Sequence, residues 1–347
     1  FGQATHDSRQ DFRRQANTGE YSENRLNNTT LIVDYNMGQG TLRSISGWVG
    51  YEFDELCDCD FTPGQIFSTA FIEDYSQFSQ EFRITSPDGD TGEWIAGIYY
   101  QTTEIEFNDE IRVPSDSMLG LVSPSLTPML GTIAARDFDQ EGDAFAIFGQ
   151  YDWNIGTDLI LTLGGRFTRE KKTASRRVDT LDLETGTITI NPIAPFVFEQ
   201  AFGIVNEQAS GHNLDGRRNE TAFTPSLGFK YWFYPDMMIY GNWRRGFKAG
   251  GFDSRANSPR SFGFNEEDAD NFEIGIKSTV LEGRGEFNLA WFYTDYDNLQ
   301  ISQFDGTSGF NVGNARNSVV TGIDVNGRLL LDNNLSLNFA MAYLDYE

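Results

Sequence analysis

The stretch NWRRGFKAGGFD, residues 242–253, gathers three cations, three glycines and three aromatic residues in a chain that is otherwise acidic. Cations among glycines can hold a phosphate, and cations beside aromatic rings can bind single-stranded nucleic acid. Neither motif is complete, because the stretch lacks the pattern G-x-x-x-x-G-K-[ST], precedes no helix pattern and is not repeated. Two interpretations remain open. In the first, the cations neutralise nearby carboxylates such as Glu266, Glu267 and Asp268. In the second, the fixed arginines capture an anionic ligand.

The two cysteines, Cys57 and Cys59, lie in DELCDCD, and the two histidines are His6 and His212. This inventory excludes most histidine-based zinc sites, and neither histidine has a partner motif for a Ser-His-Asp triad. We therefore expect no catalytic residues, no resident metal, no cofactor and no enzyme activity. The cysteine pair is a candidate disulfide formed in an oxidising compartment. The alternative is a metal site in which the two thiolates act with neighbouring aspartates.

The overall charge argues against a nucleic-acid partner. The chain has 51 acidic and 26 basic residues and a net charge of -25, which repels phosphate backbones. Aromatic residues make up 14% of the chain and there are 35 glycines, a composition that suggests strands and turns. No apolar run reaches the roughly 18 residues of a membrane helix. The first residues, FGQATHDSRQ, resemble neither a gene start nor a signal peptide, so we expect the gene product to begin upstream.

Apolar and polar residues alternate with period two along most of the chain. In GEFNLAWFYTDYDNL, residues 285–299, Phe287, Leu289, Trp291 and Tyr293 share one face. The runs at 222–233, 272–280, 319–329 and 335–343 repeat the pattern. Each run therefore predicts a strand with one apolar and one polar face. The charged residues of the polar faces are Glu81, Arg83, Lys230, Arg244, Glu273, Lys277, Asp324 and Arg328.

The connections between these runs alternate between short and long. Short turns fall at 86–92, 154–157, 234–237, 281–284 and 331–334. Long connections fall near 53–76, 107–141, 171–220, 250–268 and 302–315. A meander of this kind has all its long loops at one end, as outer-membrane barrels do. We therefore predict an all-β fold, an antiparallel transmembrane up-and-down β-barrel portion with about twelve strands and long extracellular loops.

This topology predicts which face meets lipid. The apolar face would contact the membrane, and the charged face would line the interior. Trp94, Trp153 and Trp232 stand beside short turns, where an interfacial aromatic belt is expected. A soluble sheet with one face in water is the alternative, but it does not explain the uneven loops.

The chain resembles the barrel of TonB-dependent outer-membrane receptors. The resemblance rests on DADNFEIGIKSTVLEGRGEFNLAWFYTDYDNLQ at 268–300, on RRGFKAGGF at 244–252 and on QEFRITSPDG at 80–89, and it is strongest over 221–347. It implies a barrel of about 22 strands with a plug inside it. The sequence shows neither a plug nor a TonB box, and it ends at AYLDYE rather than in a closing strand with a terminal aromatic residue. We therefore expect residues 1–347 to be a partial barrel domain of a longer receptor.

The resemblance also implies a function and partners. It predicts a receptor in the bacterial outer membrane for uptake of a scarce ligand, an iron-siderophore chelate above all, driven by the inner-membrane TonB-ExbB-ExbD complex. Cobalamin, oligosaccharides and other organic substrates would use the same scaffold, and a passive porin or structural barrel is the alternative from another class. Other partners are lipopolysaccharide, outer-membrane lipids and the small-molecule ligand. The candidate ligand-binding residues at the rim are Arg244, Lys248, Phe252, Arg255, Phe304 and Phe310.

Overall fold

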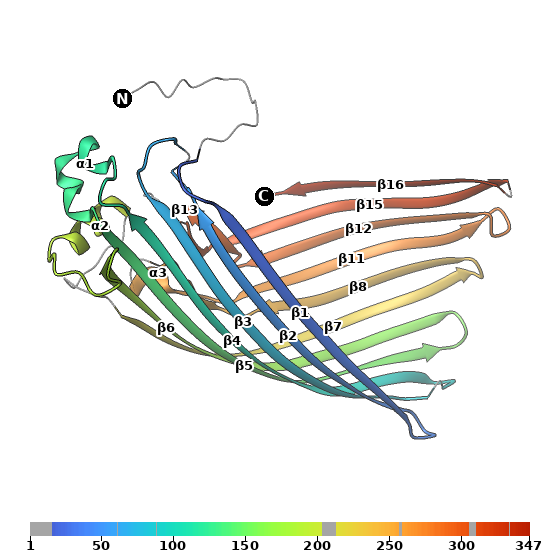
Figure 1. Cartoon of the computed structure of the whole chain (residues 1–347). Helices are drawn as coiled ribbons and strands as arrows, with labels where there is room; N and C mark the ends of the chain where they lie inside the picture. Colours follow the sequence, from blue (N-terminus) through green and yellow to red (C-terminus); the bar gives the residue numbers. More distant parts are fainter. Residues whose placement is uncertain are drawn as a thin grey trace.

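The computed structural model describes residues 16–60, 62–87, 89–202, 213–256, 259–304, 310–332 and 334–347. Within them the chain forms an antiparallel sheet of twelve strands, and each strand pairs with the next one along the chain (Figure 1). The predicted up-and-down arrangement is confirmed. The strands are β1 (Tyr21–Asn36), β2 (Thr41–Cys57), β3 (Ser68–Thr85), β4 (Gly92–Val113), β5 (Thr132–Ile155), β6 (Leu159–Asp182), β7 (Leu214–Tyr234), β8 (Met237–Lys248), β11 (Glu267–Val280), β12 (Gly285–Asp297), β15 (Asn317–Asp332) and β16 (Leu335–Tyr346).

The two ends of the sheet differ. Short turns join the strands at one end, at 37–40, 86–91, 156–158, 235–236, 281–284 and after Asp332. Short helices and two small hairpins occupy the long connections at the other end (Figure 1). None of the helices among the described residues is long and apolar enough to cross a membrane. These smaller elements are α1 (Leu119–Val122), η1 (Pro124–Met129), α2 (Ala194–Phe202), β9 (Gly251–Phe252), α3 (Pro259–Phe262), β10 (Gly263–Phe264), β13 (Gln300–Phe304) and β14 (Phe310–Asn314).

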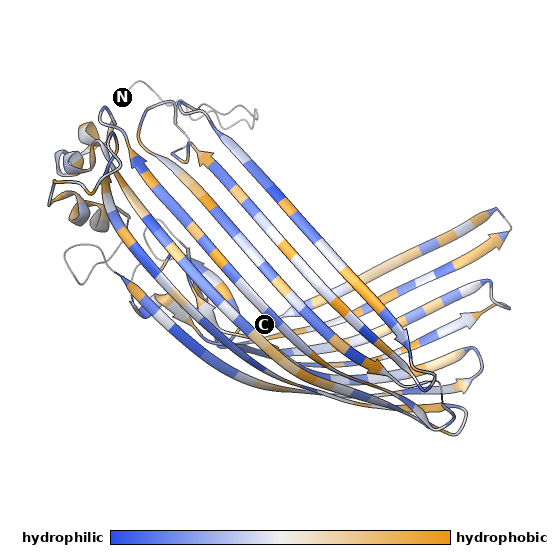
Figure 2. Ribbon diagram, turned by 60° about the horizontal axis from the view of Figure 1, so that its bottom comes forward, coloured by the Kyte–Doolittle hydropathy of each residue, from blue (hydrophilic) through white to orange (hydrophobic). Residues whose placement is uncertain are grey.

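The sheet curves into an open trough, along which apolar and polar residues alternate (Figure 2). On its convex face Ile274, Trp291 and Ile323 lie in register on β11, β12 and β15, and each is more than 40% exposed. On the concave face Asn288 donates a hydrogen bond to Asn326 on the next strand, 2.9 Å away. A curved sheet with an apolar outer face and a polar inner face is the arrangement of a barrel wall in lipid.

The apolar residues of the convex face form a band beside the short turns. On β4 the band runs from Trp94 to Tyr100 and on β5 from Trp153 to Phe145, and these four residues are exposed. A run of roughly eight residues rises about 26 Å along the strand, which at a tilt of about 40° spans about 20 Å across the membrane, near the roughly 25 Å band of a barrel. Beyond the band the convex positions become polar, as at Glu104 on β4. The band marks where the sheet meets the bilayer.

The tryptophans predicted for the interface divide between the faces. Trp94 and Trp153 are exposed on the convex face beside short turns, as predicted. Trp232 lies on the concave side instead. The reason is local, because Tyr231 and Phe233 on either side of it take the exposed convex positions of β7.

Several strands continue past the band, so three of the predicted long loops are shorter than expected. The segments predicted as loops at 53–76, 107–141 and 171–220 are reduced to 58–67, 114–131 and 183–213. The other two connections, 249–266 and 298–316, agree with the predicted loops within a few residues. In the extended parts the polarity of the faces is reversed. On β4 the concave residues Phe107, Ile111 and Val113 are buried, whereas the convex residues Glu104 and Glu106 are exposed.

Loops cover the buried concave residues of the extended strands. Val113 and Val178 pack in one cluster with Met129 of η1 and with Val197 and Phe198 of α2. Apolar burial of this kind is the main source of stability available to such a connection. The described elements of these connections, η1 and α2, therefore form a packed cap on the inner side of the extended strands.

Candidate functional site

The concave face of β7, β8 and β11 carries a polar depression of 240 Å³. Arg244, predicted from the sequence to point inward, lines it together with Tyr240, Glu273 and Lys277. The ammonium of Lys277 lies 5.3 Å from the centroid of the Tyr240 ring. Arg244 forms no ion pair within the described part of the chain. It is thus a cation available to a group that enters the trough.

The described parts of the connection 249–266, residues 249–256 and 259–266, fold inward over the concave face rather than outward into solvent. Phe252 of β9 and Phe262 of α3 pack together with their ring centroids 5.0 Å apart. They lie in one cluster with Phe107 of β4 and Phe138 of β5. Gly216 of β7 leaves room for this packing, because a Cβ at that position would overlap the Phe252 ring. We call residues 249–266 the inward loop.

Arg255 extends from the inward loop to strands at the other side of the trough. Its guanidinium carbon lies 5.6 Å from the centroid of the Phe71 ring on β3 and 5.9 Å from that of Phe107 on β4. Arg255 also interacts electrostatically with Glu73 on β3. The residue is nevertheless exposed. It presents a planar cation on an aromatic surface, which suits a flat anionic or aromatic ligand.

Two arginines with little solvent exposure lie in this region, and one of them is fully buried. Arg176 of β6 is 1% exposed and donates from Nε to the carbonyl oxygen of Ser254, 2.9 Å away. Arg136 of β5 forms a two-pronged ion pair with Asp109 of β4, whose side chain is 1% exposed. The Arg176 contact holds the inward loop against β6, whereas the Arg136–Asp109 pair joins β5 to β4.

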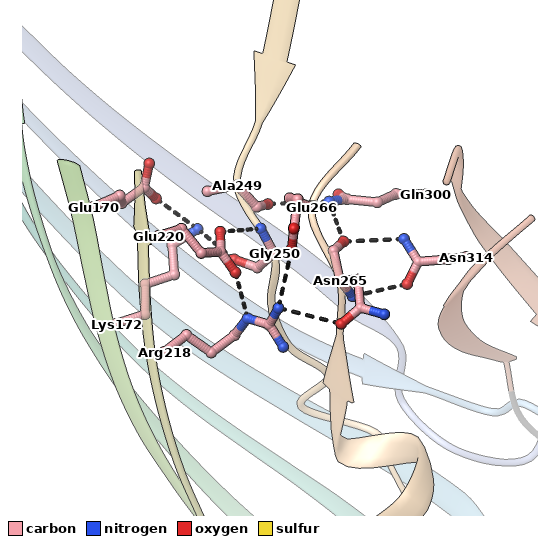
Figure 3. A network of polar contacts seen from close by, with 10 residues as sticks. All are labelled: Glu170, Lys172, Arg218, Glu220, Ala249, Gly250, Asn265, Glu266, Gln300 and Asn314. Atoms are coloured by element: carbon pink, nitrogen blue, oxygen red, sulfur yellow. Dashed lines mark hydrogen bonds and ion pairs between the residues drawn. The ribbon is translucent and has the colours of Figure 1, made fainter. Parts of the chain in front are cut away.

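A second polar network holds the start of the inward loop (Figure 3). Lys172 of β6 donates to the carbonyl oxygen of Gly250 at 3.0 Å, and the Gly250 N–H donates to Glu220 of β7 at 2.8 Å. The same Glu220 carboxylate accepts from Nε of Arg218 at 2.6 Å. The backbone ladder between β7 and β8 ends at Ser226 and Arg244. Side-chain hydrogen bonds therefore connect β6 and β7 to Gly250 beyond the point where backbone pairing between β7 and β8 ends.

The network continues to the far end of the inward loop and to the hairpin β13–β14 (Figure 3). The Gln300 side-chain amide donates to the carbonyl oxygens of Ala249 and Asn265, both at 3.0 Å. Asn314 donates to the Asn265 carbonyl oxygen at 3.0 Å and accepts from its N–H at 2.8 Å. Amide side chains that make paired contacts of this kind hold two loops in one arrangement.

Comparison with known proteins identifies this barrel wall. A family model described as TonB dependent receptor-like, beta-barrel, matches residues 1–347. The chain belongs to the TonB-dependent receptor family. The predicted fold class and the outer-membrane location are thereby confirmed, and the family consists of transporters rather than enzymes.

Solved receptor structures share the fold. The ferric yersiniabactin uptake receptor FyuA from Yersinia pestis matches with a TM-score of 0.71 at 16% identity, over 94% of this chain and 43% of FyuA. The siderophore receptor PiuA from Acinetobacter baumannii matches with 0.65 at 14% identity, over 94% and 47%. The ferric-catecholate import receptor Fiu from E. coli K12 matches with 0.58 at 16% identity, over 95% and 49%. The chain spans a little under half the length of these receptors.

The candidate ligand-binding residues that the sequence predicts at the rim lie in different parts of the structure. Phe252 and Arg255 lie together in the inward loop, and Phe252 serves its packing. Arg244 lines the separate depression, and Lys248 is exposed at the end of β8 opposite Glu267. Phe304 is 58% exposed at the tip of the hairpin β13–β14, in register with Phe310, whose side chain is outside the described part of the structure.

The structure describes both cysteines of the chain but neither histidine. Cys57 and Cys59 are joined by a disulfide where β2 ends. His6 and His212 lie outside the described residues. In the ranges that the structure describes, no three His, Cys, Asp or Glu side chains are grouped so that they could hold a metal ion.

Sequence reasoning missed the residues that anchor the mouth of the receptor. Asp109, Arg136, Arg176 and Arg218 all fall in the segments 107–141 and 171–220, for which the sequence predicts loops. In the structure they belong to strands. The sequence did contain a signal for these strands, because apolar and polar residues continue to alternate there, with the apolar residues now on the inner face. Residues two apart share one face of a strand whichever face is apolar.

Proposed function

We propose that this chain forms part of the wall and mouth of a TonB-energised receptor that takes up a scarce ligand, namely a ferric chelate. The observation that carries the proposal is Arg255, an exposed guanidinium held over the Phe71 and Phe107 rings at the mouth of the trough. A second exposed cation, Arg244, lies deeper on the same concave face. FyuA and Fiu are described as receptors for ferric ligands and PiuA as a siderophore receptor, which supports the choice of ligand class.

The chemistry of the mouth fits chelates of this class. Ferric chelates built from catecholate or phenolate groups combine negative charge with aromatic rings. A guanidinium binds carboxylate and phenolate oxygens through a planar fork, and phenylalanine rings stack on aromatic groups. Neutral oligosaccharides carry no fixed negative charge and cobalamin carries no net negative charge, so both would use Arg255 and Arg244 less than an anionic chelate does. They remain alternatives with the same scaffold.

Uptake of this kind needs partners that act through a plug inside the barrel. We propose the inner-membrane TonB-ExbB-ExbD complex as the source of energy. A passive porin or a structural barrel is the alternative function. The inward loop argues against an unobstructed pore, because it packs Phe252 and Phe262 across the concave face.

Ligand binding by the full-length receptor tests the proposal. Replacement of Arg255 by Gln removes the cation without opening a large space, and Arg244→Gln does the same in the depression. The loss of one charge-assisted contact should weaken binding of a ferric catecholate about tenfold or more. Arg284→Gln, in the short turn at the opposite end, is the matched control and should bind as the unchanged receptor does.

The panel of probes decides between ligand classes. A ferric catecholate, a ferric carboxylate chelate, cobalamin and a neutral oligosaccharide are titrated in parallel. The proposal requires the anionic chelates to bind most tightly and to depend on Arg255. Equal binding of the neutral probes, or no change on replacement of both arginines, would remove the basis for a ferric ligand.

A further inference from the structure

Glu73 lies on the concave face of β3, beside the rings that support Arg255. Phe71 precedes it by two residues on the same face of the strand, and Phe107 of β4 is in register with it. The rings of Phe71 and Phe107 stack with their centroids 6.4 Å apart. The guanidinium of Arg255 lies over both of them. The Glu73 carboxylate and the Arg255 guanidinium therefore border one aromatic surface.

The two charged groups share this surface without pairing directly. In the described part of the chain, the Glu73 side chain accepts no hydrogen bond and forms no ion pair. The Arg255 side chain donates no hydrogen bond within the same residues, and its backbone N–H donates to Asp253 at 2.8 Å. The nitrogen atoms of Arg255 and the oxygen atoms of Glu73 are thus too far apart for an ion pair. A third group that carries both an acceptor and a donor can bridge them.

Burial makes the Glu73 carboxylate a strong acceptor that lacks a donor. Burial raises the pKa of the Glu73 carboxyl, and the charge of Arg255 opposes part of that shift. A carboxylate withdrawn from water is less stable when it accepts no hydrogen bond. A cation or a donor that enters beside it stabilises the ionised form. Glu73 is thus placed to bind a donor from a ligand.

The charges around Glu73 favour a cationic group over a second anion. On β2, Glu55 lies on the same concave face, diagonal to Glu73 and about 7 to 8 Å away. On β4, Asp109 is already held in its ion pair. In the inward loop, the Asp253 carboxylate accepts two backbone N–H groups. Among the described residues, Glu55 and Glu73 therefore face Arg255 with an excess of negative charge, which attracts an ammonium group.

We propose that Glu73 is a specificity-determining residue of the ligand mouth, where it binds a protonated amine that the ferric chelate carries beside its anionic oxygens. The inference rests on the proposed function, in which Arg255 binds those oxygens. The ring pair of Phe71 and Phe107 suits both parts of such a ligand, because aromatic faces attract ammonium groups and stack on other rings. A chelate with both charges would bridge Glu73 and Arg255 and give each a partner.

Binding of two matched chelates by the full-length receptor tests this assignment. One probe is a ferric catecholate that carries a primary amine, and the other is the same chelate with the amine acetylated. Calorimetric titration gives both dissociation constants for the unchanged receptor, for Glu73→Gln and for the control Asp74→Asn. Asp74 is the next residue of β3 but is exposed on the convex face, so its replacement removes the same charge outside the mouth. Heat-modifiable migration in gels shows that both variants are folded.

Replacement of Glu73 should change the binding of the two probes in opposite directions. The amine-bearing chelate should bind about tenfold more weakly to Glu73→Gln, because it loses a charge-assisted hydrogen bond. The acetylated chelate should bind at least as tightly as before, because a negative charge is removed from the mouth. Asp74→Asn should leave both dissociation constants within about twofold of their original values. Equal changes for the two probes, or no change in either, would overturn the role of Glu73.

Arg255→Gln in the same assay separates this inference from the proposed function. Weaker binding of both chelates to Arg255→Gln, together with equal effects of Glu73→Gln on the two probes, would remove the amine site and leave the proposed function intact. Undiminished binding of the acetylated chelate to Arg255→Gln would count against the proposed function. The ratio of the two dissociation constants for Glu73→Gln decides the amine site in either case.

Discussion

Asp109 and Arg136 form an ion pair at the mouth of the barrel in which both side chains are largely withdrawn from solvent, with 1% and 14% of their surface exposed. Such a pair adds little to the stability of the fold compared with an apolar pair of the same shape. Removal of one partner, however, leaves the other charge without compensation away from water. Asp34 and Arg43 form a comparable ion pair on the exposed part of the wall. Solvent screens that second pair, so its loss has little effect.

Replacement of Asp109 by Ala should therefore destabilise the receptor, because Arg136 stays largely withdrawn from solvent but loses its partner. We expect a loss of about 3 to 5 kcal/mol, seen as a lower midpoint for the heat-modifiable transition. Asp34→Ala is the control and should leave the midpoint unchanged. Equal midpoints for the two variants would show that water reaches the Asp109 site.

The disulfide between Cys57 and Cys59 should be present in the protein isolated without reductant. An outer-membrane protein folds in an oxidising periplasm, where a pair two residues apart closes readily. Mass spectrometry should find the peptide lighter than its reduced form by two hydrogen atoms. Two free thiols in freshly prepared protein would contradict this, and a bound soft metal would favour the alternative metal site.

At the scale of the elements, the inward loop is held by packing as well as by hydrogen bonds. Phe262 is 4% exposed and lies in the cluster with Phe107 and Phe138. A truncation to alanine at such a site costs about 3 to 5 kcal/mol. The loop should consequently open more often when Phe262 is removed.

Phe262→Ala should make the inward loop sensitive to trypsin, which cleaves after Lys248, Arg255 and Arg260. Faster cleavage at these sites, followed by mass spectrometry of the fragments, is the expected result. Phe304→Ala, at a position 58% exposed, is the control. Cleavage that is equally slow in the two variants would mean that the polar network alone retains the loop.

The elements also show what the sequence could and could not predict. The strands inside the lipid band and the short turns were predictable, because lipid outside and water inside produce a regular alternation. The part of β4 beyond the lipid band was not predictable in this way. There Phe107 and Ile111 are apolar on the inner side, while Glu104 and Glu106 are polar on the outer side. Loops cover one face there and water the other, so the phase of the pattern shifts. The role of Phe252 in packing was equally hidden, since it depends on Gly216 from a distant strand.

At the scale of the whole molecule, the two ends of the sheet face opposite sides of the outer membrane. The short turn at 235–236 should face the periplasm and the connection 183–213 the cell surface. A membrane-impermeant thiol reagent applied to intact cells should label Glu184→Cys but not Asp236→Cys, both at exposed positions. Lysed cells should label at both. Labelling of Asp236→Cys alone in intact cells would invert the topology.

The edges of the sheet lead to a further prediction. β1 and β16 each pair with one neighbour within the described sheet, and a bilayer does not tolerate open strand edges. The 347 residues expressed alone should therefore fail to refold in detergent as a protease-resistant, heat-modifiable monomer. A monomer with these properties would identify a complete small barrel and favour the passive porin.

Energy-dependent uptake is the central claim, and transport by living cells tests it most directly. Accumulation of a labelled ferric chelate is measured in cells that carry the full-length receptor, with and without a working TonB complex. The account predicts saturable uptake at low concentration that is lost when TonB is absent. Uptake that rises linearly with concentration and is indifferent to TonB would contradict it.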